Sequence, residues 1–90
     1  MIRFDWDGQK ARSNLAKHGV SFDEAKTVFE DPFAISIPDP DHSDEEMRFI
    51  DLGYSQNNRL LIVVYTERND TIRIISSREA DKNERKQYET

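Results

Sequence analysis

Side chains that can hold a phosphate or move a proton recur along this chain. The set comprises Lys10, Lys17, His18, Arg48, Glu67, Arg68, Arg73, Arg78, Lys82, Arg85 and Tyr88. Cleavage of RNA without a metal needs a base for the 2′-hydroxyl proton, cations for the phosphate oxygens and an acid for the leaving 5′-oxygen. These residue types could supply all three functions. They could equally form a surface that binds an acidic partner without any chemistry.

Within this set the sequence suggests roles for individual residues. Glu67 could be the base, and Arg73 and Arg78 could hold the phosphate, because a guanidinium binds phosphate in a bidentate way. The acid would be one of three residues: Lys17, His18 or Tyr88. The remaining cations that would contact RNA are Lys10, Arg48, Arg68 and Arg85.

Each of these residues also has a structural explanation. Arg73 could form an ion pair, or pack its stem while its head reaches solvent. His18 could stabilise a helix C-terminus, and Tyr88 could pack the last helix against the sheet. The alternatives to an enzyme are therefore a non-catalytic protein-binding module, or a co-repressor that acts only in complex with a DNA-binding partner.

No motif of a metal or cofactor site stands out. The chain has no P-loop, no G-x-S-x-G, no H-E-x-x-H and no glycine pattern for nucleotides. His18 and His42 are far apart, and the loop with Asp39, Asp41 and Asp44 lacks the glycine and closing glutamate of a calcium loop. We expect neither a metal nor a cofactor.

The element that must position these side chains is a β-hairpin. Residues 60–65 form a continuous apolar run rich in β-branched side chains, which is typical of a strand buried on both faces. Asn69-Asp70 tolerates the positive φ of a tight turn, and Thr71–Ser77 follows as the second strand. This turn would place Glu67 opposite Ile72 and Thr66 opposite Arg73. Ile72 and Ile74 should share one face, with Arg73, Ile75 and Ser77 on the other.

The remaining elements complete an α+β domain. Period-two patterns predict strands over 2–6, 33–37 and 47–52, and helical patterns predict helices over 9–18, 21–30 and 79–89. Asp7, Gly19, the capping box Ser21-x-x-Glu24 and Asp31-Pro32 are typical of helix ends. The predicted order is β-α-α-β-β-β-β-α, a small antiparallel sheet with two N-terminal helices on one face and a C-terminal helix.

Size and composition fit one domain over residues 1–90. The chain has 90 residues, of which 36% are hydrophobic and 34% charged, with a formal net charge of −5. A single modest core is expected at this length. There is no cysteine, no signal-peptide pattern and no run of transmembrane length, so a cytoplasmic protein without a membrane partner is expected. The acidic balance argues mildly against nucleic acid, but local arginines can still bind phosphate.

Taken together, three groups of residues resemble the BrnT toxin family over nearly the whole chain. The first is Trp6-Asp7, Lys10, Asn14, Lys17-His18-Gly19-Val20, Phe22, Ala25 and Asp31-Pro32. The second is Pro40-Asp41-His42-Ser43, Arg48-Phe49-Ile50 and Gly53. The third is Val64-Tyr65-Thr66-Glu67-Arg68, Ile72-Arg73-Ile74-Ile75-Ser76, Arg78, Ala80, Glu84-Arg85 and Tyr88.

This resemblance implies a RelE-like fold and a ribonuclease toxin of a type II toxin-antitoxin system that inhibits translation. It also implies a partner, an antitoxin of the BrnA type with a DNA-binding domain, which neutralises the toxin in a heterotetramer. Operator DNA would be bound only indirectly, through that antitoxin. RelE-like toxins carry their basic and acidic residues on an exposed sheet face, which is similar to the pattern of charges on the hairpin here.

Overall fold

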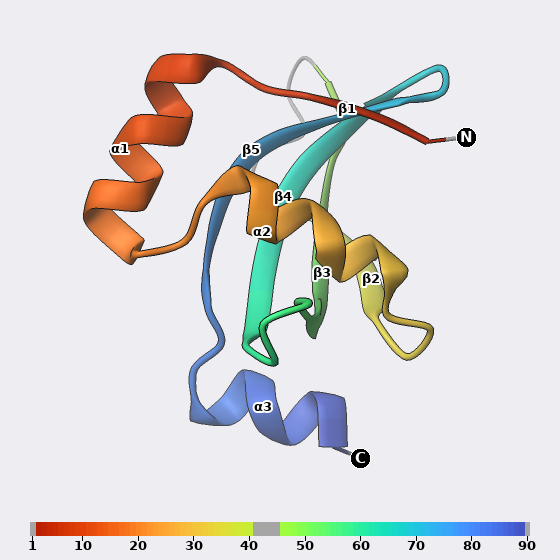
Figure 1. The fold of residues 1–90 in the computed structure, drawn as a ribbon. Helices are drawn as coiled ribbons and strands as arrows, with labels where there is room; N and C mark the ends of the chain where they lie inside the picture. The colour runs from red at the N-terminus through yellow and green to blue at the C-terminus, as the bar shows by residue number, and fades with distance from the viewer. Residues whose placement is uncertain (1, 41–45, 90) are drawn as a thin grey trace.

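A computed structural model describes residues 2–40 and 46–89 of the chain. Its strands are β1 (Arg3–Asp5), β2 (Ile35–Pro38), β3 (Arg48–Tyr54), β4 (Leu60–Arg68) and β5 (Thr71–Glu79). Its helices are α1 (Gly8–His18), α2 (Phe22–Ala25), the 3-10 helix η1 (Lys26–Glu30) and α3 (Lys82–Glu89). The predicted α+β class and the order β-α-α-β-β-β-β-α are confirmed (Figure 1).

The five strands form one sheet in the order β1-β5-β4-β3-β2, with β4 at its centre. β2 to β5 form an antiparallel meander, and the predicted pairs Glu67–Ile72 and Thr66–Arg73 are confirmed. Asn69 adopts the positive φ of 57° that the hairpin turn requires. β1 lies parallel to β5, which the expected antiparallel sheet did not include. The helical connection between β1 and the meander permits this parallel pairing.

The sheet has two unlike faces. α1, α2 and η1 cover the face that we call the helix face, where Val20, Phe22 and Val28 pack on Val63 and Ile74 (Figure 1). The opposite side, the outer face, carries a second apolar cluster of buried and half-buried residues. Its members are Ile50, Leu52, Tyr54, Leu60, Ile62, Val64, Ala80 and Tyr88. The C-terminal helix α3 covers only the end of this face near the β3–β4 turn (Figure 1).

A bulge in β5 changes the expected facing of one residue. Val64 pairs with Ser76, whereas Tyr65 pairs with Ile74, so Ile75 is an extra residue in β5. Arg73 faces outward as predicted. Ser77 does not: the bulge shifts the alternation by one, and Ser77 is buried on the helix face, where its backbone N–H donates to the Asn14 side chain (3.0 Å).

The helix ends follow the predicted signals, with two differences. Asp7 caps α1, Gly19 ends it with a φ of 69°, and Ser21 Oγ accepts the Glu24 N–H. The second helix, however, changes to 3-10 geometry after Ala25. The strand expected from residue 33 begins only at Ile35, because the Asp31 carboxylate accepts the Phe33 N–H (2.9 Å) and holds a turn there.

The last helix also starts later than expected. Strand β5 extends through Glu79, and α3 begins at Lys82 rather than at residue 79. The Asp81 carboxylate accepts the Glu84 N–H at 2.8 Å, and the Glu84 carboxylate accepts the Asp81 N–H at 2.9 Å. This reciprocal pair is a capping box, and it sets the start of the helix.

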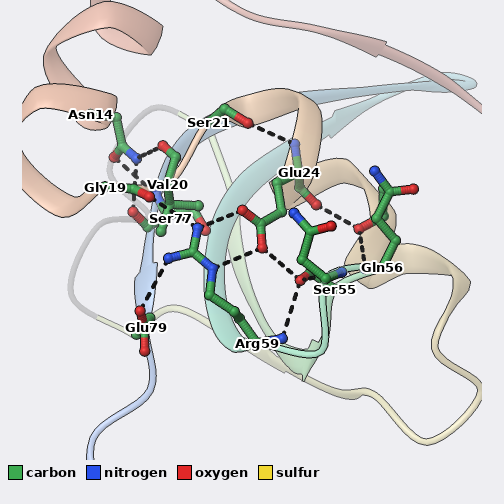
Figure 2. Close-up of polar contacts among 12 residues, drawn as sticks. Asn14, Gly19, Val20, Ser21, Glu24, Ser55, Gln56, Arg59, Ser77 and Glu79 are labelled. Carbon is green, nitrogen blue, oxygen red and sulfur yellow. Dashed lines mark hydrogen bonds and ion pairs between the residues drawn. The ribbon is translucent and has the colours of Figure 1, made fainter.

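The Glu24 side chain lies at the centre of a polar network (Figure 2). Its buried carboxylate accepts hydrogen bonds from Arg59 Nε (2.9 Å) and Ser55 Oγ (2.7 Å). Arg59 also donates to the Gly19 carbonyl (2.9 Å) and to Glu79 (3.1 Å). Through two ion pairs and a hydrogen bond, Arg59 therefore joins the β3–β4 turn to α2, to the end of β5 and to the end of α1.

This network should make the fold sensitive to acid. Hydrogen bonds from Arg59 hold the pKa of Glu24 below its ordinary value of 4.5. A lowered pKa stabilises the fold above the ordinary value, and this stabilisation is lost as the pH falls through the folded-state pKa. We expect urea unfolding to show a falling free energy of unfolding between about pH 5 and pH 3. Glu24→Gln should be less stable at pH 7 and less dependent on pH, whereas Glu30→Gln, an exposed control on η1, should behave like the parent.

Candidate functional site

A groove runs between α1 and the edge of β5. β1 pairs with β5 only as far as Arg73, so none of the described strands lies beside the following part of this edge. The groove has a volume of about 460 Å³. Its walls are Asp7, Gln9, Lys10, Ser13, Asn14, Lys17 and His18, with Ile75 and Ser76 from β5. The predicted RNA contact Lys10 and two of the predicted acids therefore line one groove.

The groove adjoins a cavity on the outer face of the sheet. This cavity has a volume of about 270 Å³ and shares His18 and Ser76 with the groove. Ile50, Ile62 and Val64 form its apolar floor, and Arg78 and Glu84 are also on its walls. His18, the last residue of α1, is therefore common to the walls of the groove and of the cavity. The structure thus brings His18 and Arg78, which are 60 positions apart in the sequence, into one concave site.

Arg78 is held by a carboxylate of the protein itself. Its Nη1 and Nη2 atoms each donate to one oxygen of Glu84, both at 2.8 Å. The same pairing holds the pKa of Glu84 below its ordinary value of 4.5, so the carboxylate is ionised at neutral pH. A bidentate pair of this shape is how a guanidinium also binds a phosphate. Glu84 therefore occupies the position that an anionic substrate would take on Arg78.

A second basic group lies at the other end of the outer face. The sheet register aligns Arg48, Thr66, Arg73 and Asp5 in one row across four strands. Arg73 pairs with Asp5 at 3.1 Å. Arg68, two residues after Thr66 on the same face, donates twice to Glu46 at 2.6 and 2.8 Å. Arg73 and Arg78 are separated along β5 by about 16 Å, so they do not form one clamp.

Glu67, the base that the sequence suggested, lies apart from both groups. It pairs with Ile72, whose side chain is in the core of the helix face, and residues paired across strands share a face. Arg73 and Arg78 lie on the outer face. The period of two along β4 alone places Glu67 and Thr66 on opposite sides of the sheet.

Tyr88 and Arg85 hold α3 in place. The Tyr88 hydroxyl donates to Asp31 (2.6 Å), and its ring meets that of Tyr54 edge-on at 5.1 Å. The hydrogen bond to Asp31 raises the pKa of Tyr88 to about 12, which makes it a poor acid. Arg85 Nη1 lies 3.4 Å from the Tyr54 hydroxyl. Neither side chain lines the groove or the cavity.

Glu84, Glu46 and Ser76 belong to these sites, although their residue types alone predicted no role for them in binding or catalysis. The bidentate pairs of Glu84 and Glu46 depend on contacts between residues of different elements, so no local sequence pattern predicts these pairs. Glu84 alone had a signal that could have been used, since Asp81-x-x-Glu84 is a capping-box spacing.

Two further observations bear on function. Among residues 2–40 and 46–89, no group of three or more His, Asp or Glu side chains is arranged to hold a metal ion. His42, Asp41 and Asp44 lie outside the described residues. Within the same ranges, no helix has the length and apolarity to span a membrane.

A family model and a solved structure that match the chain both belong to ribonuclease toxins. The model of the family described as "Ribonuclease toxin, BrnT, of type II toxin-antitoxin system" matches residues 6–84. Among solved structures, the chain is similar to the ribonuclease toxin BrnT of Brucella abortus, whose crystal structure has a resolution of 1.1 Å. That similarity has a TM-score of 0.67 and 21% sequence identity, and it covers 91% of this chain and 100% of the other. No curated protein matches the chain.

Proposed function

Since the chain belongs to the BrnT family of ribonuclease toxins from type II toxin-antitoxin systems, we propose that it cleaves RNA at the concave site between α1, β5 and α3. The observation that carries this location is the cavity of about 270 Å³ with His18 and Arg78 on its walls. Lys10 and Lys17 line the adjoining groove, where they would contact neighbouring phosphates of the RNA. Arg48, Arg68 and Arg73 would contact RNA farther along the outer face.

The proposed reaction is a transesterification that needs no metal. The 2′-oxygen of the RNA attacks the adjacent phosphorus, and the bond from phosphorus to the 5′-oxygen breaks. Arg78 holds the non-bridging oxygens and stabilises the charge that develops on them. His18 donates a proton to the leaving 5′-oxygen. The products are a 2′,3′-cyclic phosphate and a free 5′-hydroxyl.

Glu84 is the proposed base. When a phosphate of the RNA takes the two Nη atoms of Arg78, the Glu84 carboxylate is released from that contact. It is then an ionised carboxylate beside the bound phosphate, where it can accept the 2′-hydroxyl proton. Glu67, the base suggested by the sequence, lies on the other face of the sheet, so we assign it no step.

The proposed biology follows from the family. The toxin would act in the cytoplasm and inhibit translation by cleaving RNA. An antitoxin of the BrnA type would neutralise it in a heterotetramer, and operator DNA would be bound through that antitoxin. If the protein binds an antitoxin but cleaves no RNA, the alternative of a non-catalytic module or co-repressor is favoured.

RNA cleavage by the purified protein should survive chelation. We expect a labelled RNA to be cut at the same rate in about 5 mM EDTA as without it, because Arg78 replaces the Lewis acid that a metal would supply. Gel electrophoresis should resolve the cyclic phosphate product. Expression in bacteria should stop growth and degrade RNA, and co-expression of the antitoxin should restore growth. Loss of cleavage in EDTA would contradict the metal-independent mechanism.

A further inference from the structure

The Glu46 carboxylate lies among three arginines. It accepts two hydrogen bonds from Arg68, at 2.6 and 2.8 Å. The strand register places Arg48 and Arg73 on the same face as Arg68, on either side of Thr66. The hydrogen bonds from Arg68 and the charges of all three arginines lower the pKa of Glu46. Glu46 is thus one internal anion of this site, and Asp5, which pairs with Arg73 at 3.1 Å, is the other.

A buried hydroxyl lies in the middle of the same group. Thr66 pairs directly with Arg48 on one side and with Arg73 on the other, and Arg68 is two residues farther along β4. Residues in these positions share the outer face with Thr66. Thr66 is only 3% exposed, and its Oγ1 atom has no hydrogen-bond partner among residues 2–40 and 46–89. Buried hydroxyls are normally hydrogen-bonded, so this donor lacks the acceptor that an anion with several oxygens could supply.

We propose that this arginine site is a second phosphate subsite for RNA, and that Glu46 competes with the RNA for it. The inference rests on the proposed function, because RNA is the substrate that would bring a phosphodiester to the site. A phosphodiester offers two non-bridging oxygens to the arginines, as the carboxylate of Glu46 does. It can displace Glu46 readily, since the Arg68–Glu46 pair is exposed (side chains 56% and 37%) and such pairs are weak.

The subsite also accounts for how an acidic chain could bind RNA. Arg68, Arg73 and Arg78 are paired with Glu46, Asp5 and Glu84 of the same chain. When RNA binds, its phosphates replace these carboxylates on the arginines. The affinity for RNA then depends more on the local cations than on the net charge of −5. Glu46 would thereby limit the affinity of the free toxin for RNA.

The test measures binding without cleavage. A fluorescent oligoribonucleotide with 2′-O-methyl groups cannot be cut, because its nucleophile is blocked, and anisotropy gives its Kd at several salt concentrations. Glu46→Gln should bind this RNA about three- to tenfold more tightly than the parent. The slope of log K against log salt should steepen by about 0.7, the value for one more phosphate contact on a single strand. Glu30→Gln changes the net charge equally on the other side of the sheet and should leave both quantities near those of the parent.

Two further variants test the Thr66 hydroxyl and the arginines of the site. Thr66→Val keeps the shape and β-propensity of the residue and should weaken RNA binding severalfold in the Glu46→Gln background. Arg48→Ala in the Glu46→Gln background should abolish the increase in affinity for RNA. An NMR titration with inorganic phosphate, read on the arginine Nε–H signals, distinguishes a free anion from RNA. A response to phosphate without tighter RNA binding would assign the site to free anions and overturn the RNA proposal.

The remaining outcomes separate this inference from the proposed function. If Glu46→Gln and Glu30→Gln tighten RNA binding equally, the effect is one of net charge and the subsite is refuted. If Glu46→Gln binds RNA like the parent, the subsite is refuted even where unmodified RNA is still cut. If Glu46→Gln binds RNA more tightly but neither protein cuts unmodified RNA, the subsite stands and the ribonuclease proposal fails. If only an acidic peptide binds Glu46→Gln more tightly, the site belongs to a protein partner.

Discussion

Replacing His18 with alanine should slow RNA cleavage by about 10²- to 10⁴-fold, which is the usual contribution of a positioned acid. His18 lines both the groove and the cavity, and Arg78 lines the same cavity. The variant should remain folded, because His18 is exposed at the end of α1 and its charge contributes at most about 1 kcal/mol there. Single-turnover cleavage of a labelled RNA measures the loss.

A sulfur-substituted substrate separates the acid role from a general loss of structure. RNA with a 5′-bridging sulfur has a leaving group that departs without a proton, so an acid is no longer needed. On this substrate His18→Ala should cut nearly as fast as the parent. Arg12→Ala, which removes an exposed cation from the same helix outside the groove, should retain activity on both substrates. An equal loss of His18→Ala on the two substrates would show that His18 does not protonate the leaving oxygen.

The largest expected effect on stability comes from Asn14. Its side chain is 6% exposed, and its Nδ2 donates to the carbonyls of Val20 (2.9 Å) and Ser77 (2.8 Å). Its Oδ1 accepts the Ser77 N–H at 3.0 Å. The amide of Asn14 therefore forms the hydrogen bonds to Ser77 that a neighbouring strand would otherwise form at this point of the β5 edge (Figure 2). Asn14→Ala leaves these buried backbone groups without partners, and we expect a loss of about 2–4 kcal/mol in the free energy of unfolding.

Urea unfolding followed by circular dichroism checks this loss. Ser13→Ala, an exposed change at the next position of α1, should stay within about 0.5 kcal/mol of the parent. Asn14→Asp keeps the size and the acceptor but loses both donors, so it should be at least as unstable as Asn14→Ala at neutral pH. A stable Asn14→Asp would mean that the two donated hydrogen bonds contribute little. Because Asn14 holds α1 against β5, both variants should also weaken RNA cleavage.

The order of helices and strands, several helix ends and the hairpin register could be predicted from the sequence. Asp7, Gly19 and Ser21 set helix ends through hydrogen bonds to residues within four positions, and Asn69-Asp70 set which residues face each other across the turn. These features depend on local backbone chemistry and on side-chain periods, which are visible in one dimension. The residue types of a phosphate-binding site could be recognised in the same way.

The fold, in contrast, determines which of those side chains lie in the same site. The bulge at Ile75 turned Ser77 inward, and the strand period placed Glu67 on the face opposite Arg78. Arg78 and His18 line one cavity because α1 ends near β5. Glu84 and Glu46 each form a bidentate pair with an arginine of a strand, Arg78 and Arg68. The physical reason is that a side chain's partners across a sheet are set by register and packing, in which residues far apart in the chain take part. The sequence shows which chemistry each side chain can perform. The fold determines which other side chains lie close enough to take part in it.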